Sequence, residues 1–401
     1  MRRIKDQWHN YFDLGLIGSA HGLSDGFSSL LVPVLALIVT DLNLSTIRTG
    51  TLLSVFSLAT FFFLFPLSIT ADHSGSKKVI LIIGLSIASL AYFGMQWVPG
   101  FTLLAVLTFV AGAGNAAYHP CGTALAAERF ASRRAIAISF HSLMGNFGAS
   151  IMPVVQAAVA TSFGWRTAIA VCTLPAAIIL PLIGMRFPRG DRANVSDGPT
   201  LASLRILTTM VLKNRNVVIL AIVYALKGMA TKTMVGFFPL LASGKFGMKT
   251  SLIGTALTLY FFMGVGAKPI MGYLYNRWGA RSALFYPLCL SGGVALLVGF
   301  IPWAPALIVS LGLAGLIMPI SPIILTAAAD MSDKEALASS VGFIYTFHGL
   351  GFVAPLIGGW LADGFGMSAN YIFAAILIWV SGATSLALSR NVRKAAPDKP
   401  R

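Results

Sequence analysis

The chain has 401 residues, of which 56% are hydrophobic and 10% charged, and its mean hydropathy is +0.80. Soluble domains carry about 25% charged residues, so this composition excludes a soluble globular protein and indicates a polytopic membrane protein. The formal net charge of +16 would suit a nucleic-acid partner. The Lys and Arg residues, however, gather in the breaks between apolar stretches, where they follow membrane topology, so we expect no nucleic-acid binding.

Twelve apolar stretches are long enough to cross a bilayer as helices, since a span needs about 20 residues. They lie near residues 11–39, 49–71, 78–98, 101–127, 134–160, 165–187, 215–241, 250–274, 281–301, 303–329, 337–362 and 367–390. The predicted fold is therefore an all-α integral membrane protein with twelve transmembrane helices. The segments between them are too short to bury a core, so no extramembrane domain is expected.

The distribution of basic residues predicts the orientation. With the N-terminus in the cytoplasm, the inside segments hold 22 of the 29 Lys and Arg residues. The outside loops hold only four, namely Arg48, Arg166, Lys245 and Lys249. Cytoplasmic loops carry the excess of Lys and Arg, so both termini are predicted to be cytoplasmic. The other three basic residues fall inside predicted helices: Lys227, Lys232 and Lys268.

An internal repeat divides the chain into two halves. We predict an N-terminal six-helix bundle at 1–187, a cytoplasmic linker at 188–214, and a C-terminal six-helix bundle with a basic tail at 215–401. Displacements of 202 to 206 residues superpose the two bundles, which indicates a duplicated, pseudo-symmetric pair. The superposed pairs include His21 with Lys227, Asp25 with Thr231, Pro33 with Pro239, Gly50 with Gly254, Pro120 with Pro322, Asn146 with His348, Pro153 with Pro355 and Gly164 with Gly366.

A duplicated pair of six-helix bundles resembles the major facilitator superfamily, whose halves rock about a site near the bilayer midplane. The segments HGLSD, GNAAYHP and SFHSLMGNFGASIMP resemble the fosmidomycin-resistance branch of that superfamily. The matching residues are His21, Asp25, His119, Pro120, Gly145, Asn146, Phe147 and Gly148. Tyr118 departs from the usual Phe, and Cys121-Gly122 stands where a Glu often follows the Pro. The resemblance implies a secondary transporter working by alternating access, in a branch associated with efflux of small drugs.

The loop motif typical of the superfamily is degenerate in this chain. Ser68 replaces its first glycine, and in the second half Asn276 replaces its acid. The resemblance implies a conformational latch made of the residues that remain. These are Asp72, Gly75, Lys77 and Lys78 in the first half, and Gly272, Arg277, Gly279 and Arg281 in the second.

Ionisable side chains at mid-membrane are costly, so they usually face the protein interior or a wet cavity. Here they lie on predicted helices 1, 4, 5, 7, 8 and 11, and the helices that are outer supports in the superfamily have none. They are His21, Asp25, His119, His141, Lys227, Lys232, Lys268 and His348. This is the pattern that a central cavity would produce.

His21 and Asp25 are four residues apart, hence on one face of a helix and within reach of each other. Asp25 is the candidate site of proton coupling, because desolvation disfavours its carboxylate form whereas a nearby cation favours it. His21 joins it, since histidine changes charge near physiological pH. The alternative is a locally satisfied pair that only packs helix 1 against a neighbour.

The candidate substrate-binding residues are Lys227, His119, Asn146, His348, Lys232, Thr231 and Tyr224. Lys227 shares a helix face with Thr231, which places a cation opposite the pair on helix 1. A cavity with several bases and one acid favours an anionic or zwitterionic substrate. Simpler roles stay open: an interior contact for Lys232, a proline kink beside His119, and packing for His141. Lys268 is predicted to snorkel to the membrane surface.

The sequence predicts proton-coupled efflux, by antiport, of a small anionic or zwitterionic compound or drug. Proton-coupled uptake of an organic anion is the alternative, and a non-transporting receptor or channel is the alternative of another class. Catalytic motifs such as HExxH or a Walker loop do not occur, so no enzyme is expected. The three cysteines show no metal-ligand spacing, so we expect no metal and no cofactor. The expected form is a monomer in a bacterial cytoplasmic membrane, with protons, a small molecule and lipid as its partners.

Overall fold

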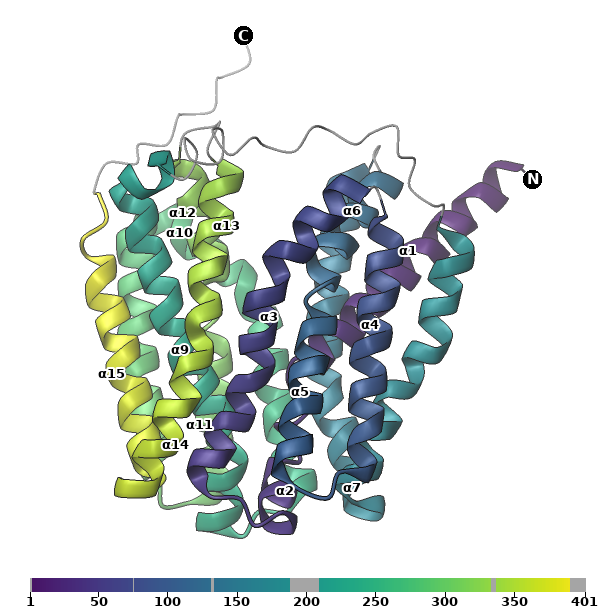
Figure 1. Ribbon diagram of the computed structural model, residues 1–401. Coiled ribbons are helices and arrows are strands. Elements are labelled where there is room, and N and C mark those ends of the chain that lie inside the picture. Colours follow the sequence, from purple (N-terminus) through teal and green to yellow (C-terminus); the bar gives the residue numbers. More distant parts are fainter. Residues whose placement is uncertain (1, 75, 131–132, 188–208, 333–336, 390–401) are drawn as a thin grey trace.

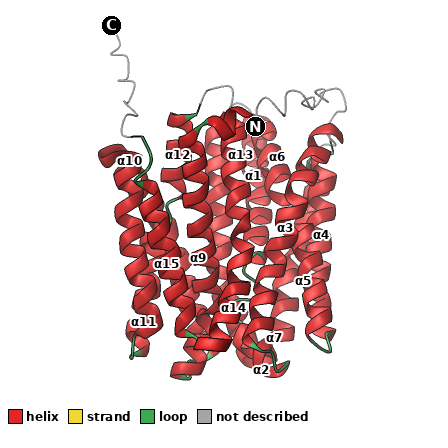
Figure 2. Cartoon of the chain, turned by 60° about the vertical axis from the view of Figure 1, so that its left-hand side comes forward, coloured by secondary structure: helices red, strands yellow, loops and turns green. Residues whose placement is uncertain are grey.

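The computed structural model describes residues 2–74, 76–130, 133–187, 209–332 and 337–389, and it leaves undescribed the side chains of 2–10, 72–74, 134–135 and 337–339. Throughout these residues the regular structure is helical and no strand occurs. Figure 2 shows the helices running side by side along one direction. The all-α prediction is confirmed for this part of the chain.

The helices fall into two sequential groups. The first contains α1 (Arg2–Phe27), α2 (Leu35–Asp41), α3 (Thr46–Ser74), α4 (Lys77–Gly94), the short η1 (Met95–Trp97), α5 (Phe101–Asn115), α6 (Tyr118–Arg129) and α7 (Arg134–Arg186). The second contains α9 (Arg215–Phe246), α10 (Thr250–Phe300), α11 (Ala304–Ile317), α12 (Ser321–Met331), α13 (Leu337–Gly349), the short η5 (Leu350–Phe352), α14 (Val353–Phe365) and α15 (Ser368–Ser385).

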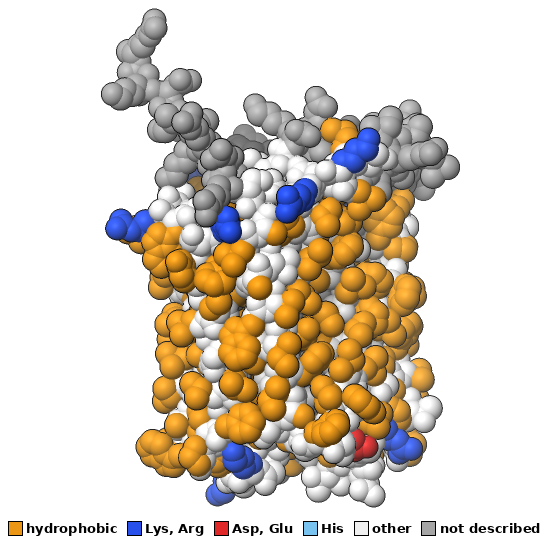
Figure 3. Space-filling model, turned by 90° about the vertical axis from the view of Figure 1, so that its left-hand side faces the viewer, with side chains coloured by type: hydrophobic (Ala, Val, Ile, Leu, Met, Phe, Trp, Pro, Cys, Tyr) orange, Lys and Arg blue, Asp and Glu red, His pale blue; other side chains and the backbone are white. Residues whose placement is uncertain are grey.

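Among the described residues, nine helical stretches are long and apolar enough to cross a membrane. Those in α7 and α10 are each 51 residues long. Each is interrupted by a glycine with non-helical backbone angles, Gly164 (φ 78°, ψ 166°) and Gly279 (φ 74°, ψ 169°), so each consists of two helices joined end to end. Figure 3 shows a broad apolar band with Lys and Arg near its two ends, as a lipid-facing surface requires. Exactly twelve spans stay a prediction.

Each half of the chain has its own hydrophobic core. One cluster of buried hydrophobic residues comes from residues 16–187 and the other from residues 211–388. Figure 1 shows that α1 begins and α15 ends at the same end of the molecule. The boundaries of the two bundles and the side of the membrane on which the termini lie stay predictions.

The structure supports the predicted duplication. Helices α5 and α11 end at Asn115 and Ile317, and α6 and α12 end at Arg129 and Met331, so both pairs of ends differ by 202 residues. Gly164 and its repeat-mate Gly366 also share a backbone conformation, with φ of 78° and 81°. Only glycine adopts this region without a steric penalty.

The predicted first helix, over 11–39, is wrong as a single element. Helix α1 ends at Phe27, residues 28–34 form turns, and α2 begins at Leu35. At this end of α1, side-chain hydroxyl groups form hydrogen bonds with backbone carbonyl oxygens. Ser28 donates to Asp25 O (2.6 Å), and Tyr92 donates to Phe27 O (2.7 Å). Such local bonds compete with the helix, and Pro33 has no N–H to continue it.

Three other predicted spans contain breaks as well. The break expected at His119-Pro120 is confirmed: α5 and α6 are separated at 116–117, because the proline cannot donate to the carbonyl one turn back. Its counterpart separates α11 from α12 before Pro322. The predicted helix over 337–362 is wrong as one element, since η5 divides it into α13 and α14.

Two reciprocal contacts join the halves. A Cβ atom on Gly50 of α3 would overlap the carbonyl oxygen of Pro355 on α14, and one on Gly254 of α10 would overlap that of Pro153 on α7. Gly50 and Gly254 are repeat-mates, and so are the two prolines. Small residues allow helices in membranes to approach closely. The halves therefore meet in the paired manner expected of a pseudo-twofold arrangement.

Helix α1 packs against α7 through another glycine pair. A Cβ atom on Gly148 would overlap the backbone of Gly22. One turn earlier on α7, a Cβ atom on Gly145 would lie 2.6 Å from both Oδ2 of Asp25 and Cε1 of His21. This close approach holds the polar side chains of α1 against α7.

We expect Gly148→Ala to lower the midpoint of thermal unfolding in detergent, measured by tryptophan fluorescence. The added methyl group must push α1 away from α7, and overpacking of this kind costs about 1–3 kcal/mol. Gly293→Ala is the matched control, because a Cβ there meets nothing within 4 Å. Equal midpoints for the two variants would refute the close contact between α1 and α7.

Candidate functional site

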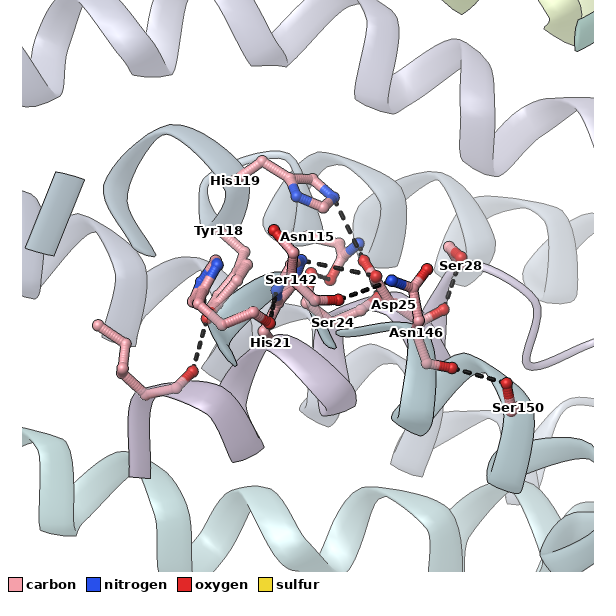
Figure 4. A network of polar contacts seen from close by, with 12 residues as sticks. His21, Ser24, Asp25, Ser28, Asn115, Tyr118, His119, Ser142, Asn146 and Ser150 are labelled. Atoms are coloured by element: carbon pink, nitrogen blue, oxygen red, sulfur yellow. Dashed lines mark hydrogen bonds and ion pairs between the residues drawn. The ribbon is translucent and has the colours of Figure 1, made fainter. Parts of the chain in front are cut away.

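Asp25 of α1 lies between two imidazole rings (Figure 4). Nε2 of His21 is 3.5 Å from Oδ2 of Asp25, and Nε2 of His119 is 3.5 Å from Oδ1. The spacing of four residues places His21 and Asp25 together, and the break before α6 brings His119 to them. The structure thus unites the predicted proton-coupling pair with one predicted substrate residue.

A hydrogen bond sets the orientation of His21. Its Nδ1 lies 2.7 Å from the carbonyl oxygen of His141 on α7. A carbonyl oxygen only accepts, so Nδ1 carries the hydrogen and Nε2 is the nitrogen that faces Asp25. The rings of His21 and His141 stack with centroids 4.0 Å apart, and that of Tyr118 stacks on His21 at 5.3 Å.

Tyr118 and His141 belong to this cluster, although the sequence does not select them as site residues. The Tyr118 hydroxyl donates to Ile17 O (2.8 Å) and lies 3.0 Å from Nε2 of His141. A hydroxyl has one hydrogen, so His141 donates its Nε2–H to the tyrosine oxygen. The one signal in the sequence is that Tyr118 departs from the Phe of the resembling branch. The partners that satisfy His141 are therefore themselves part of the site.

Two further polar contacts that sequence reasoning missed fix α1. Ser24 and Asn115 of α5 exchange hydrogen bonds, from Ser24 Oγ to Asn115 Oδ1 (3.0 Å) and from Asn115 Nδ2 to Ser24 O (3.2 Å). Near the middle of α1, the fully buried Asp13 pairs with Arg129 (2.6 Å) and Arg186 (2.9 Å). These bonds tie α1 to α5, α6 and α7, so the helix that carries Asp25 is anchored along its length.

Lys268 of α10 reaches across to the first half. Its Nζ donates to Oδ1 of Asn146 on α7 at 2.7 Å, in a partly buried contact. The prediction that Lys268 snorkels to the surface is wrong, because its side chain points at a neighbouring helix and finds an acceptor there. Lys268 also interacts electrostatically with Asp25. It thus takes the opposing position that the sequence assigned to Lys227.

The remaining predicted substrate residues gather on α9 and α13. The rings of Tyr224 and His348 stack with centroids 4.1 Å apart, and Lys227 and Lys232 both interact electrostatically with His348. The Thr231 hydroxyl donates to Lys227 O (2.9 Å) within α9. The structure thus forms a second group of these residues, and Lys227 in this group lies near enough to Lys268 for their like charges to repel.

The lysines of this region form no ion pair with an acidic side chain among the described residues. Within the described part of the chain, the ion pairs involve other basic side chains, and Lys227, Lys232 and Lys268 form none. All three are partly buried. An ammonium group removed from water without a counter-charge is unfavourable, so an incoming anion would be stabilised here.

The predicted latch residues are only partly described. The side chain of Asp72 and all of Gly75 lie outside the described residues. Lys77 pairs with Glu128 of α6 (2.6 Å), and Lys78 donates to the carbonyl oxygens of Gly184 (3.1 Å) and Phe187 (2.5 Å) at the end of α7. Both lysines therefore bind within the first half, and a latch between the halves stays a prediction.

In the second half, the latch segment lies where α10 changes direction. Gly279 makes that bend with its positive φ, whereas a Cβ on Gly272 would meet nothing within 4 Å. Arg277 is exposed and lines a cavity of about 640 Å³ together with Trp278 and Asp330.

Membrane-spanning helices in two repeated halves, with ionisable side chains where the halves meet, define a multi-pass membrane transporter. The model of the Major Facilitator Superfamily matches residues 17–252 and 220–401, and the chain belongs to this family. Its partners are therefore a small-molecule substrate and the lipid bilayer, and family membership implies a transporter rather than an enzyme.

Comparison with known proteins agrees with this assignment. The chain is 23% identical over 378 residues to the fosmidomycin resistance protein of Escherichia coli (strain K12), covering 91% of this chain and 89% of that protein. It is 22% identical over 160 residues to the uncharacterized MFS-type transporter YfnC of Bacillus subtilis (strain 168), a match spanning only 39% of each chain. The fold is shared with the crystal structure of a bacterial homologue of the human lysosomal transporter Spinster, in an inward-facing and unoccupied conformation. The TM-score is 0.83 at 12% sequence identity, and the match covers 94% of this chain and 96% of that chain.

Proposed function

We propose that the protein is a proton-coupled antiporter that exports a small anionic or zwitterionic compound from a bacterial cell. The observation that carries this proposal is the position of Asp25, which lies between two imidazoles and interacts electrostatically with Lys268 of the other half. The alternating-access cycle is that of a twelve-helix transporter in the cytoplasmic membrane, with both termini in the cytoplasm.

Asp25 and His21 serve as the proton-coupling pair. Asp25 is partly exposed, with 25% of its side-chain surface accessible, whereas His21 has 10%. Its neighbours are His21 and His119, whose charge depends on protonation, and Lys268, whose distance from Asp25 would change if the two halves moved. A carboxylate whose cationic neighbours move during the cycle binds a proton more weakly when they are near and more strongly when they leave. This is the requirement for coupling a proton to a conformational change.

The basic groups on α9 and α10 favour an anionic group on the substrate. Lys227 and Lys232 are the candidate anchors, with His348 and Tyr224 beside them and Asn146 and His119 on the opposite half. Charge-assisted hydrogen bonds contribute more than neutral ones, so a carboxylate or phosphonate would be held at these lysines. A zwitterion would in addition place its cation near Asp25.

The direction of transport is proposed from the relative that spans most of the chain, a resistance protein against fosmidomycin. The same basic site would suit proton-coupled uptake of an organic anion, since symport and antiport share this architecture. Vesicles with an acidic interior separate the two, because protons leaving the vesicle would drive substrate inward by antiport and outward by symport. A receptor or channel would show no substrate movement that depends on the gradient.

Asp25→Asn should abolish the pH dependence of transport. Amide nitrogen and oxygen cannot bind a proton in this range, so the gradient should no longer drive accumulation of anionic or zwitterionic compounds, fosmidomycin among them, in vesicles. Exchange of labelled for unlabelled substrate at equal pH should persist, because it requires no net proton movement.

Asp41→Asn is the matched control, since Asp41 is an exposed carboxylate paired with Arg166 at 2.6 Å, away from the site. It should keep the pH dependence of the unmodified protein. An Asp25→Asn protein that moves substrate with unchanged pH dependence would falsify the proton assignment.

Lys227→Gln should weaken the binding of anionic substrates. Losing a charge-assisted hydrogen bond costs about 1.5–3 kcal/mol, which corresponds to roughly a 10- to 100-fold rise in Kd. The measurement is the KM or Kd for an anionic compound beside that for an uncharged analogue, whose affinity should change little.

The control for this variant is Lys249→Gln, which removes the same charge from an exposed side chain before α10. If both variants bind the anionic compound equally well, the assignment of Lys227 to the substrate is wrong.

A further inference from the structure

We propose that His21, Asp25 and His119 form a binding site for a divalent transition-metal ion of the Zn²⁺ class. One ligand atom from each of the three side chains lies within 4.8 Å of the others. The three residues come from two helices, α1 and α6, and their positions in the chain match no metal-binding motif. Folding therefore brings the three ligands together, and no sequence motif marks the site.

The distances favour an ion between the ligands over direct hydrogen bonds. Nε2 of His21 lies 3.5 Å from Oδ2 of Asp25, and Nε2 of His119 lies 3.5 Å from Oδ1, whereas a charge-assisted N–H···O bond is about 2.7–2.9 Å long. Around a tetrahedral Zn²⁺ with ligand bonds of about 2.0–2.2 Å, neighbouring ligand atoms are about 3.3–3.6 Å apart. These two separations match this edge length, and all three ligand atoms lie within 4.8 Å of one another, so a small rotation of the side chains would complete the site.

The surroundings of His21 are those of a metal ligand. Its Nδ1–H donates to the carbonyl oxygen of His141 at 2.7 Å, and metal-ligating histidines usually donate their second nitrogen to such an acceptor. Stacking against His141 and Tyr118 fixes the ring. In neutral His21 the Nε2 lone pair then faces the Asp25 carboxylate. Two electron-rich groups in this position are stabilised by a positive charge between them.

The site is open on one side. The accessible fraction of the side chain rises from 10% in His21 to 25% in Asp25 and 48% in His119, so an ion would enter past His119. Three protein ligands leave a fourth position of the tetrahedron for water or for an anionic group of a substrate. Two imidazoles and one carboxylate suit Zn²⁺, Co²⁺, Ni²⁺ or Cu²⁺, whereas Mg²⁺ and Ca²⁺ prefer oxygen ligands.

One neighbouring charge opposes the ion. Lys268 interacts electrostatically with Asp25 and with His21, but its ammonium group already donates to Asn146 at 2.7 Å. His141 uses its Nε2–H toward the Tyr118 hydroxyl, so that nitrogen offers no lone pair to the ion. The net surroundings therefore leave Asp25 as the counter-ion of the metal.

On the proposed function, which this step rests on, the metal would compete with the coupling proton. The ion would occupy the atoms of His21 and Asp25 that take up the proton, so metal and proton would exclude each other. Zn²⁺ should then inhibit pH-driven transport.

The test is direct metal binding to the purified full-length protein in detergent, after removal of any histidine tag. Isothermal titration with Zn²⁺ should give one ion per chain, and Co²⁺ should give the intense visible absorption of a tetrahedral site. His119→Ala and Asp25→Asn should each weaken Zn²⁺ binding by about tenfold or more, since even loss of an outer-shell partner costs 10- to 100-fold. Asp41→Asn removes a carboxylate outside the site, paired with Arg166, and should bind Zn²⁺ as the unmodified protein does.

Zn²⁺ affinity unchanged in both His119→Ala and Asp25→Asn would overturn the metal site, as would octahedral Co²⁺ spectra or equal competition by Mg²⁺. His119 is half exposed, so its alanine variant keeps the test valid if Asp25→Asn fails to fold, and gel filtration identifies such a failure. The outcome is separate from that of the transport assays. Stoichiometric Zn²⁺ binding together with unchanged pH dependence in Asp25→Asn would leave the metal site standing and remove the proton assignment.

Discussion

The reciprocal contact between Gly50 and Pro355 and between Gly254 and Pro153 determines how the two halves face each other. Each glycine lets a helix of one half reach the carbonyl oxygen of a proline in the other half, and in a membrane such packing replaces the hydrophobic driving force that water would supply. Because repeat-mates meet in both contacts, α3 packs against α14 and α10 packs against α7. The hydrogen bond from Lys268 to Asn146 lies on that interface.

The duplication is symmetric in the backbone and asymmetric in charge. The helix breaks and the Gly164 and Gly366 bends recur at matching positions, whereas His21 and Asp25 have become a lysine and a threonine in the second half. The acid and its imidazoles thus lie on one side, and the cations without acidic partners lie on the other. A rocking motion of the halves would change the distance between opposite charges, which gives protonation of Asp25 a way to affect the conformation.

The sequence predicts the features that depend on local composition and misses those that depend on packing. Helical spans, the duplication and the pairing of His21 with Asp25 follow from hydropathy, spacing and turn residues, and the structure contains them. The end of α1 at Phe27 is missed, because hydroxyl groups from Ser28 and from Tyr92 on another helix compete for its carbonyl oxygens. Lys268 is misjudged for the same reason: its partner Asn146 is 122 residues away in the chain, and no local pattern marks the contact.

The placement of Asp25 raises one electrostatic problem with several solutions. Once Nδ1 of His21 is committed to a backbone carbonyl, its Nε2 lone pair and the carboxylate of Asp25 face each other in a poorly solvated region. A proton on either group, a metal ion between them, or the approach of a cation such as Lys268 would each stabilise the pair. The proton, the metal ion and the cation compete with one another, because each places positive charge near the same few atoms. Whatever occupies the site therefore sets how strongly Lys268 is attracted, and so affects the contact between α10 and α7 that links the halves.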